Sequence, residues 1–157
     1  MQAGAQPRVD KRFLHQTAAD TLMGRLLRKF WQPVALSIDL KAASARPVRV
    51  LGENLTLYRG ASGRAHLIGE RCAHRCSVLH TGVIEGEQLR CMYHGWRYNG
   101  EGVCTDMPAE KQPRPNTIRI AGYPVHEYSG LIFAYLGQQP VPEFDLPRKD
   151  VFEDETR

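Results

Sequence analysis

The feature that most constrains the fold of this chain is a pair of short segments, each of which brings a cysteine and a histidine close together. The first segment is Cys72-Ala73-His74 and the second is Cys91-Met92-Tyr93-His94, with sixteen residues between His74 and Cys91. Thiolates and imidazoles are both metal ligands in proteins. The two segments therefore predict a metal site that is built from two loops facing each other.

Two kinds of metal centre are open to two cysteines and two histidines. In a 2Fe-2S cluster with mixed ligation, one iron takes both thiolates and the other takes both imidazoles, so each loop contacts both irons. The alternative is a zinc site, which would make the chain a module that binds other proteins and not an electron-transfer protein. Zinc sites usually separate paired ligands by two to four residues, and Cys72 and His74 are closer than that. The spacing favours one 2Fe-2S cluster per chain.

Composition and charge exclude several other functions. The chain has 157 residues, 42% of them hydrophobic and 24% charged, which is typical of one globular domain. Its net charge of +4 comes from scattered lysines and arginines, so no nucleic-acid partner is expected. The longest apolar run, 131–136, is far shorter than the ~20 residues of a membrane helix. Residues 1–12 lack the apolar core of a signal peptide, which predicts a cytoplasmic protein without a membrane partner.

The order of patterns along the chain predicts three segments. Residues 1–19 are expected to be poorly ordered, 20–137 to form the folded domain, and 138–157 to be a linker-like tail. Apolar residues at three- and four-residue spacing from Leu22 to Phe30 predict a short helix whose apolar stripe packs in the core. Thr17 or Asp20 is expected to cap this helix, and Pro33 to end it.

Short runs rich in β-formers follow the helix, with turn residues between them. Residues 99–102 read as the turn of a hairpin, and Ser129-Gly130 as a second turn. The predicted strands are 47–51, 55–59, 65–70, 96–98, 103–105, 117–121, 125–128 and 131–136. Such regularly spaced short strands favour an all-β fold, a small antiparallel sandwich or barrel.

The metal-site segments resemble a known signature. Cys72-Ala73-His74-Arg75 and residues 91–98 resemble the Rieske motif of ring-hydroxylating, non-haem iron oxygenases. Residues 22–34, 102–110 and 123–137 resemble flanking segments of the phthalate dioxygenase type. The resemblance spans roughly residues 20–140. It implies a small antiparallel β-sandwich Rieske domain, with a cluster-binding subdomain of two loops and a short N-terminal helix.

The resemblance also assigns residues to the cluster. Cys72 and Cys91 are expected to hold the inner iron, and His74 and His94 the outer, exposed iron from which electrons leave. Trp96 is expected either beside the cluster or as a plain core aromatic. The other two cysteines, Cys76 and Cys104, are expected to be free, packed thiols, because Tyr93 stands where respiratory Rieske proteins have a bracing cysteine.

Two roles are compatible with this resemblance. The first is the electron-relaying domain of an oxygenase α subunit, which takes electrons from a reductase or ferredoxin and passes them to a catalytic domain. The alternative is a free-standing Rieske ferredoxin between a reductase and an oxygenase. The family's catalytic iron is held by two histidines and a carboxylate, and no such set follows Leu136, so no catalytic residue is expected in this chain.

The residues beside the ligands also suggest a redox potential. High-potential family members have a serine two residues after the second histidine ligand, where this chain has Trp96. Fewer hydrogen bonds to the cluster make reduction harder. The resemblance therefore implies a potential on the order of −150 to −100 mV, near the low end for Rieske centres.

Overall fold

The computed structural model describes residues 11–146 of the chain, which contain one α-helix and eleven short strands. Three 3₁₀ turns, η1 (Lys11–Leu14), η2 (Ser37–Asp39) and η3 (Leu79–Thr81), connect some of them. The helix is α1 (Leu22–Leu27), and the strands are β1 (Trp31–Leu36), β2 (Ala45–Val50), β3 (Glu53–Arg59), β4 (Ala65–Gly69), β5 (Val83–Glu85), β6 (Gln88–Arg90), β7 (Arg97–Tyr98), β8 (Cys104–Asp106), β9 (Gly122–Tyr123), β10 (Val125–Tyr128) and β11 (Leu131–Tyr135).

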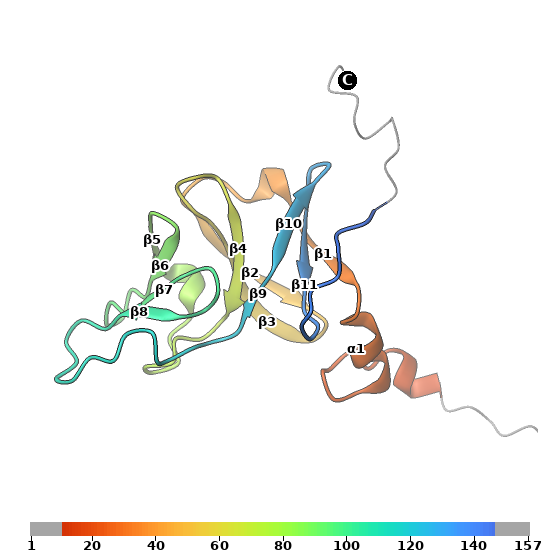
Figure 1. Cartoon of the computed structure of the whole chain (residues 1–157), viewed down its shortest axis with the longest axis horizontal. Coiled ribbons are helices and arrows are strands. Elements are labelled where there is room, and N and C mark those ends of the chain that lie inside the picture. Colours follow the sequence, from red (N-terminus) through yellow and green to blue (C-terminus); the bar gives the residue numbers. More distant parts are fainter. Residues whose placement is uncertain (1–10, 147–157) are drawn as a thin grey trace, which may run out of the picture.

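The strands form three antiparallel sheets, with the orders β1-β11-β10, β2-β3-β4-β9 and β5-β6-β7-β8. The first two sheets pack together, and we call them the base. The third sheet belongs to residues 70–121, which we call the distal subdomain. It lies at one end of the molecule, away from α1 (Figure 1). The predicted all-β antiparallel fold with a short N-terminal helix is confirmed.

Strand β3 is buried on both faces because it lies between two hydrophobic cores. Its Leu55 and Leu57 point into the core of the base, whereas Tyr58 points into the core of the distal subdomain. The base core also contains Leu40, Val50, Leu67, Ile132, Ala134 and Leu136, and the distal core Ile68, Cys72, Leu79, Leu89, Cys91, Trp96, Tyr98, Cys104 and Met107. The sheet β2-β3-β4-β9 therefore packs against the core that contains the cysteines of the two cysteine–histidine segments.

Helix α1 is shorter than predicted and begins and ends differently. Its N-cap is Thr21, whose hydroxyl accepts a hydrogen bond from the amide of Gly24, and not Thr17 or Asp20. The helix ends at Leu27, and Pro33 lies in β1. This strand is at the edge of its sheet, where a residue without an amide proton is tolerated, and its register shifts beside the proline.

The prediction that the apolar stripe of α1 packs in the core is wrong. Leu22 is 64% exposed and Phe30 is 58% exposed. Gly24 packs instead against the segment before the helix, where a Cβ atom would have no space beside the backbone of Ala18. The helix contacts the base through Arg28, the residue that follows it.

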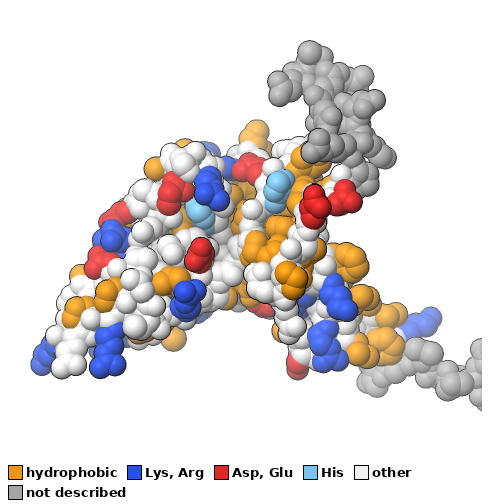
Figure 2. All heavy atoms as spheres, in the orientation of Figure 1, with side chains coloured by type: hydrophobic (Ala, Val, Ile, Leu, Met, Phe, Trp, Pro, Cys, Tyr) orange, Lys and Arg blue, Asp and Glu red, His pale blue; other side chains and the backbone are white. Residues whose placement is uncertain are grey.

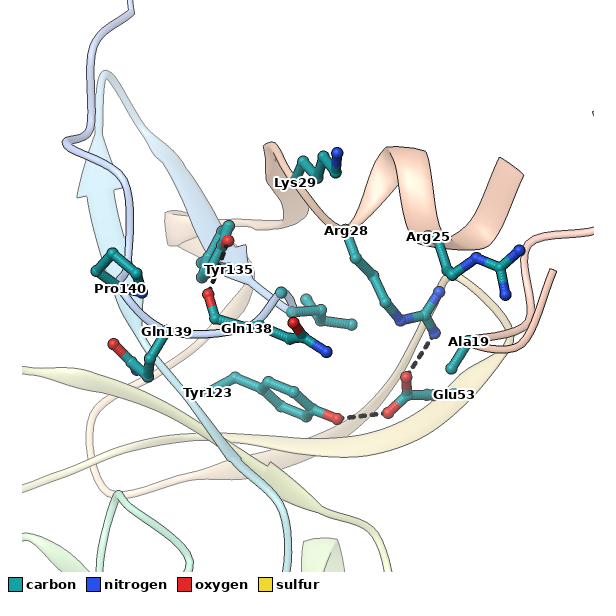
Figure 3. A pocket seen from close by; sticks show the side chains of 12 residues that line it. Ala19, Arg25, Arg28, Lys29, Glu53, Tyr123, Tyr135, Gln138, Gln139 and Pro140 are labelled. Atoms are coloured by element: carbon teal, nitrogen blue, oxygen red, sulfur yellow. Dashed lines mark hydrogen bonds and ion pairs between the residues drawn. The ribbon is translucent and has the colours of Figure 1, made fainter. Parts of the chain in front are cut away.

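Arg28 is buried because its charge is neutralised inside the structure. Its guanidinium donates to the carboxylate of Glu53, which also accepts a hydrogen bond of 2.6 Å from the hydroxyl of Tyr123 (Figure 3). The guanidinium donates further bonds to backbone carbonyls of Thr17 and Leu51. This network joins the end of α1 to the β2–β3 turn, to β3 and, through Glu53, to β9. The buried contact of the helix is therefore made by a charged residue and not by the leucines.

Most predicted strands are present, with ends that differ by one or two residues. The predicted hairpin across residues 99–102 is confirmed, with Tyr98 paired to Cys104. Residues 117–121 form only one isolated bridge, between Val103 and Arg119, and are not a strand. The three-residue strands β5 and β6 were not predicted. No helix in residues 11–146 is long and apolar enough to cross a membrane.

The predicted terminal segments fall largely outside the described residues. Residues 1–10 and 147–157 are not described by the structure. Within the described part of the tail, Phe144 packs against Trp31, with ring centres 5.4 Å apart, and stacks on His126 at 4.0 Å. The indole of Trp31 also donates to the carbonyl of Pro142. Residues 138–146 thus contact the outer face of the β1-β11-β10 sheet.

Candidate metal centre

The first cysteine–histidine segment is a tight loop closed by two backbone hydrogen bonds. The amide of Cys72 donates to the carbonyl of Ser77 over 2.9 Å, and the amide of Cys76 donates back to the carbonyl of Cys72 over 2.9 Å. Cys76 has a φ angle of 56°, in the left-handed region that few non-glycine residues adopt. This turn exposes the side chains that follow Cys72.

The second segment closes in the same way, although its histidine lies one residue further from its cysteine. The amide of Cys91 donates to the carbonyl of Trp96, and the amide of Gly95 donates to the carbonyl of Cys91. Gly95 has a φ angle of 77° and takes the place that Cys76 has in the first loop. The two loops are therefore structural equivalents, each with its cysteine on the inner side.

The two thiols lie together inside the distal core. Cys72 and Cys91 are each 2% exposed and belong to the same core cluster, and Cys91 is close enough to contribute to raising the pKa of Cys72. The Sγ of Cys72 is 3.2 Å from the hydroxyl of Tyr98, which also accepts a bond from the amide of Ala73. Burial raises the pKa of the Cys72 thiol, so thiolate formation here requires a positive centre such as a metal.

The two imidazoles meet at the surface side of the same loops. The ring centres of His74 and His94 are 4.5 Å apart, and both side chains are half-buried. Desolvation and the neighbouring charges of His74 and Arg75 lower the pKa of His94, which favours the neutral ring that binds metals. The Nε2 atom of His74 lies 3.5 Å from a carboxylate oxygen of Glu110.

The other nitrogen of His74 shows where a ligand belongs. Its Nδ1 atom is buried and has no hydrogen-bond partner among residues 11–146. Buried polar atoms are normally satisfied, so such an atom needs a partner that the protein itself does not supply. The indole of Trp96 stacks on the His74 ring, at 4.8 Å with an angle of 7° between the planes, and its Nε1 atom is likewise buried and unpaired within the described chain.

The donor set fits a two-iron cluster. Within the described residues, no group of three or more His, Cys, Asp and Glu side chains is placed to hold one metal ion. The four donors form two pairs instead, thiols inside and imidazoles outside. Two thiolates for one iron and two imidazoles for the other is the ligation that a mixed 2Fe-2S cluster requires. This pairing is the positive ground for preferring an iron–sulfur cluster over zinc.

The residues around the donors were predicted with mixed success. Trp96 is a core residue whose ring stacks on His74, and its place beside a cluster stays a prediction. Cys104 is a free, buried thiol as expected. Cys76 is free but exposed, so its predicted packing is wrong, because its left-handed turn directs it away from the core. The contact of Tyr98 with Cys72 was missed, although a tyrosine inside the predicted hairpin beside the motif was a usable signal.

Comparison with known proteins places these loops in a family. A family model described as the Rieske [2Fe-2S] domain matches residues 30–129. The phenoxybenzoate dioxygenase subunit alpha of Ectopseudomonas oleovorans is 43% identical over 145 residues, which cover 90% of this chain and 34% of that protein. The chain spans about one third of the length of the curated relatives it matches.

Solved structures give the same result at the level of the fold. A crystal structure of dicamba monooxygenase with non-haem iron and dicamba has a TM-score of 0.73 and 27% identity, covering 82% of this chain and 39% of that one. An oxygenase solved in complex with the ferredoxin of carbazole 1,9a-dioxygenase has a TM-score of 0.66 and 30% identity, covering 74% of this chain and 31% of that one.

Proposed function

We propose that this chain, which belongs to the Rieske [2Fe-2S] domain family, is the electron-relaying domain of an aromatic ring-hydroxylating oxygenase. Family membership implies a 2Fe-2S cluster and a role in electron transfer. The observation that carries the proposal is the arrangement of the donors, with two thiols buried in the distal core and two imidazoles side by side near the surface. One electron at a time enters or leaves such a cluster when it is bound.

We assign the four ligands residue by residue. Cys72 and Cys91 would hold the inner iron, because their thiols are enclosed by the core. His74 and His94 would hold the outer iron, and the unpaired Nδ1 atom of His74 is the natural donor on that ring. The ring of Tyr93 lies 3.7 Å from that of His94, while Trp96 covers His74. These rings flank the two imidazoles, and the exposed imidazole edges would be the shortest route for an electron.

The assignment to an oxygenase rests on the relatives. Proteins named as dioxygenase or demethylase oxygenase subunits match this chain at 38 to 43% identity over most of its length. Electrons would come from a reductase or ferredoxin and pass to an oxygenase catalytic domain. A free-standing ferredoxin remains the alternative role. The proposed setting is the cytoplasm, where four unpaired cysteines are kept from forming disulfides.

The central test is the metal content and activity of the purified chain. We expect about two irons and two acid-labile sulfides per chain, with negligible zinc, and a low average g-value after reduction. We also expect no oxygen-dependent hydroxylation of aromatic compounds by the chain alone. Zinc in place of iron would contradict the cofactor, and a hydroxylated product would show a catalytic iron in this chain. Stimulation of a separate Rieske oxygenase by the added chain would favour the ferredoxin alternative.

A surface beside the two histidines has the character of a docking site for the electron donor. The apolar side chains of Met92 and Tyr93 are 62% and 60% exposed there. Three cations are exposed in the same subdomain: Arg75, which follows His74, Lys111, which follows Glu110 with its carboxylate 3.5 Å from the Nε2 atom of His74, and Arg114. Figure 2 shows lysine and arginine side chains at the far end of the distal subdomain. We call this the tip surface, and it consists of His74, Arg75, Met92, Tyr93, His94, Lys111 and Arg114. A donor with acidic residues around an apolar centre fits it.

Charge reversal on the tip surface should slow reduction by an acidic donor. In the variant with Arg75→Glu, Lys111→Glu and Arg114→Glu, the second-order rate constant for reduction by an acidic ferredoxin should fall about tenfold at low salt. The difference should vanish near 0.5 M salt, because screening removes long-range attraction between exposed charges. Stopped-flow absorbance at several ionic strengths measures both effects.

A matched variant on the base controls for net charge. Lys41, Arg49 and Arg64 are exposed cations outside the distal subdomain, and their reversal to glutamate changes the net charge by the same amount. This control should lose less than half of the rate. An equal loss in both variants would mean that overall charge, and not the tip surface, steers the donor.

The hydroxyl of Tyr98 should raise the reduction potential of the cluster. It lies 3.2 Å from the Sγ of Cys72, and a hydrogen bond to a ligand sulfur stabilises the added electron. With a net value of about 1 kcal/mol for the bond, Tyr98→Phe should lower the potential by about 20 to 60 mV. Film voltammetry at pH 7 measures this. Tyr123→Phe, which removes a hydroxyl bonded to Glu53 in the base, should leave the potential unchanged. An unchanged or higher potential in Tyr98→Phe would contradict the assignment.

A further inference from the structure

Besides the packing of Tyr58 and Ile68 in the distal core, polar contacts join the distal subdomain to the base at two places along strand β4. The first is the chain connection itself, where the amide of Gly69 donates to the carbonyl of Ala121 over 2.8 Å. The second lies near His66, at the other end of the strand. His66 is three residues from Gly69, which corresponds to about 10 Å along a β-strand. A single attachment permits rotation about it, whereas two separated attachments fix an orientation.

The second attachment is the turn between β5 and β6. The amide of Ala61, in the turn between β3 and β4, donates to the carbonyl of Gly86 over 2.8 Å. The hydroxyl of Tyr58 donates to the carbonyl of Glu87 over 3.0 Å. Backbone atoms of the distal turn are thus held by two different residues of the base.

The side chain of Glu87 adds a charged contact to this attachment. One carboxylate oxygen accepts a bond of 2.7 Å from the amide of Ser62, and the other lies 3.0 Å from the Nε2 atom of His66. These two contacts lower the pKa of Glu87 to about 2. Gly60 faces the same carboxylate, and a Cβ atom there would be 2.5 Å from it, so the backbone has been brought close to receive this side chain.

His66 is held between the two parts of the molecule. Its ring stacks on Tyr58 of the base, with ring centres 4.9 Å apart and an angle of 27°. On the other side lies Gly100 in the turn between β7 and β8, where a Cβ atom would be 2.2 Å from the Nδ1 atom of His66. The imidazole therefore contacts the distal subdomain at two turns, through Glu87 and through Gly100.

We propose that Glu87 and His66 form a latch that fixes the orientation of the distal subdomain, and with it His74 and His94, relative to the base. Both are positioning residues, and neither contacts the proposed cluster ligands. The inference rests on the proposed electron-transfer function, because electron transfer depends steeply on the distance and direction between donor and acceptor. Without the latch, the second attachment would keep only the bonds from Ala61 to Gly86 and from Tyr58 to the carbonyl of Glu87, beside the packing of Tyr58 in the distal core. The subdomain would then sample a wider range of orientations.

A distance measurement within the cluster-loaded chain tests this directly. A nitroxide on the base, at the exposed position Asn54→Cys, and the reduced cluster give a distance distribution by pulsed electron paramagnetic resonance. Cys76→Gly removes the exposed native thiol, and glycine suits the left-handed φ angle there. Against this background, Glu87→Ala should at least double the width of the distribution, and His66→Ala added to it should cause little further broadening.

The matched control removes a comparable carboxylate that joins parts of the base only. Glu127 in β10 accepts two bonds, of 3.0 and 3.1 Å, from the guanidinium of Arg59 in β3. Glu127→Ala should lower the melting temperature about as much as Glu87→Ala while the distribution stays narrow. If Glu87→Ala does not fold, Glu87→Gln serves, since it removes the charge and keeps the shape.

The outcomes separate the latch from the function on which it rests. A wild-type chain that yields no reduced-cluster signal contradicts the proposed function, whatever the latch does. A loaded Glu87→Ala chain with a distribution as narrow as wild type, or a Glu127→Ala chain that broadens equally, contradicts the latch alone.

Discussion

A chain in which Cys91 is replaced by alanine is expected to contain no 2Fe-2S cluster. The inner iron would keep a single protein ligand, Cys72, and the core around it offers no other thiolate in the same position. Iron content should fall from about two per chain to nearly zero, and the visible absorption should disappear. Cys72→Ala should have the same effect. Iron analysis after anaerobic reconstitution measures this loss without reference to any activity.

The remaining cysteines provide controls of two different kinds. Cys104 lies in the same core as the two proposed ligands and donates to the carbonyl of Asp106, so Cys104→Ala tests the loss of a buried thiol as such. Cys76 lies in a ligand loop but is exposed, so Cys76→Gly tests disturbance of the loop. Both should retain a full cluster. If Cys104→Ala lost it as completely as Cys91→Ala, packing and not ligation would explain the result.

The proposed ligands could be named from the sequence because their information is local. Each pair lies within four residues, and the loop that closes around it needs only a residue that accepts a left-handed φ angle, which Gly95 supplies. The equivalent residue in the other loop is Cys76, which the sequence does not mark as a turn residue. The equivalence of the loops became visible only from their hydrogen bonds.

The environment of α1 could not be predicted because it depends on distant residues. The periodicity of its leucines indicated an apolar face, but which face is buried was decided by the contact of Gly24 with Ala18 and by the ion pair of Arg28 with Glu53. Glu53 lies 25 positions further along the chain, and no helical pattern contains it. Sequence periodicity predicts that a helix forms, but it does not predict which residues the helix packs against.

The latch between Glu87 and His66 could not be predicted either, because it also depends on residues that are distant in the sequence. His66 in β4 and Glu87 in the turn between β5 and β6 are 21 positions apart, and neither belongs to a motif. A single histidine such as His66 carries no information in the sequence about which residues will lie next to it. His66 meets Glu87 only because the distal subdomain packs against the base, so the contact depends on the tertiary structure.

Replacing both proposed imidazole ligands by thiolates should produce the largest change in potential. The variant His74→Cys with His94→Cys exchanges two neutral ligands for two anions, which makes addition of an electron much harder. Starting from about −150 to −100 mV, the potential should fall by roughly 250 mV toward the −400 mV of plant-type clusters with four cysteine ligands. The average g-value of the reduced state should rise at the same time.

The size of this shift distinguishes ligation from a nearby electrostatic effect. A change of about 250 mV corresponds to more than four factors of ten in an equilibrium constant for one electron, beyond what a single hydrogen bond such as that of Tyr98 supplies. His126→Cys places a thiol on the exposed face of β10, away from the distal subdomain, and should leave the potential unchanged. If the double variant holds too little cluster to measure, His94→Cys alone should move the potential in the same direction. A potential that stays at the wild-type value in a loaded variant would mean that neither histidine binds the outer iron.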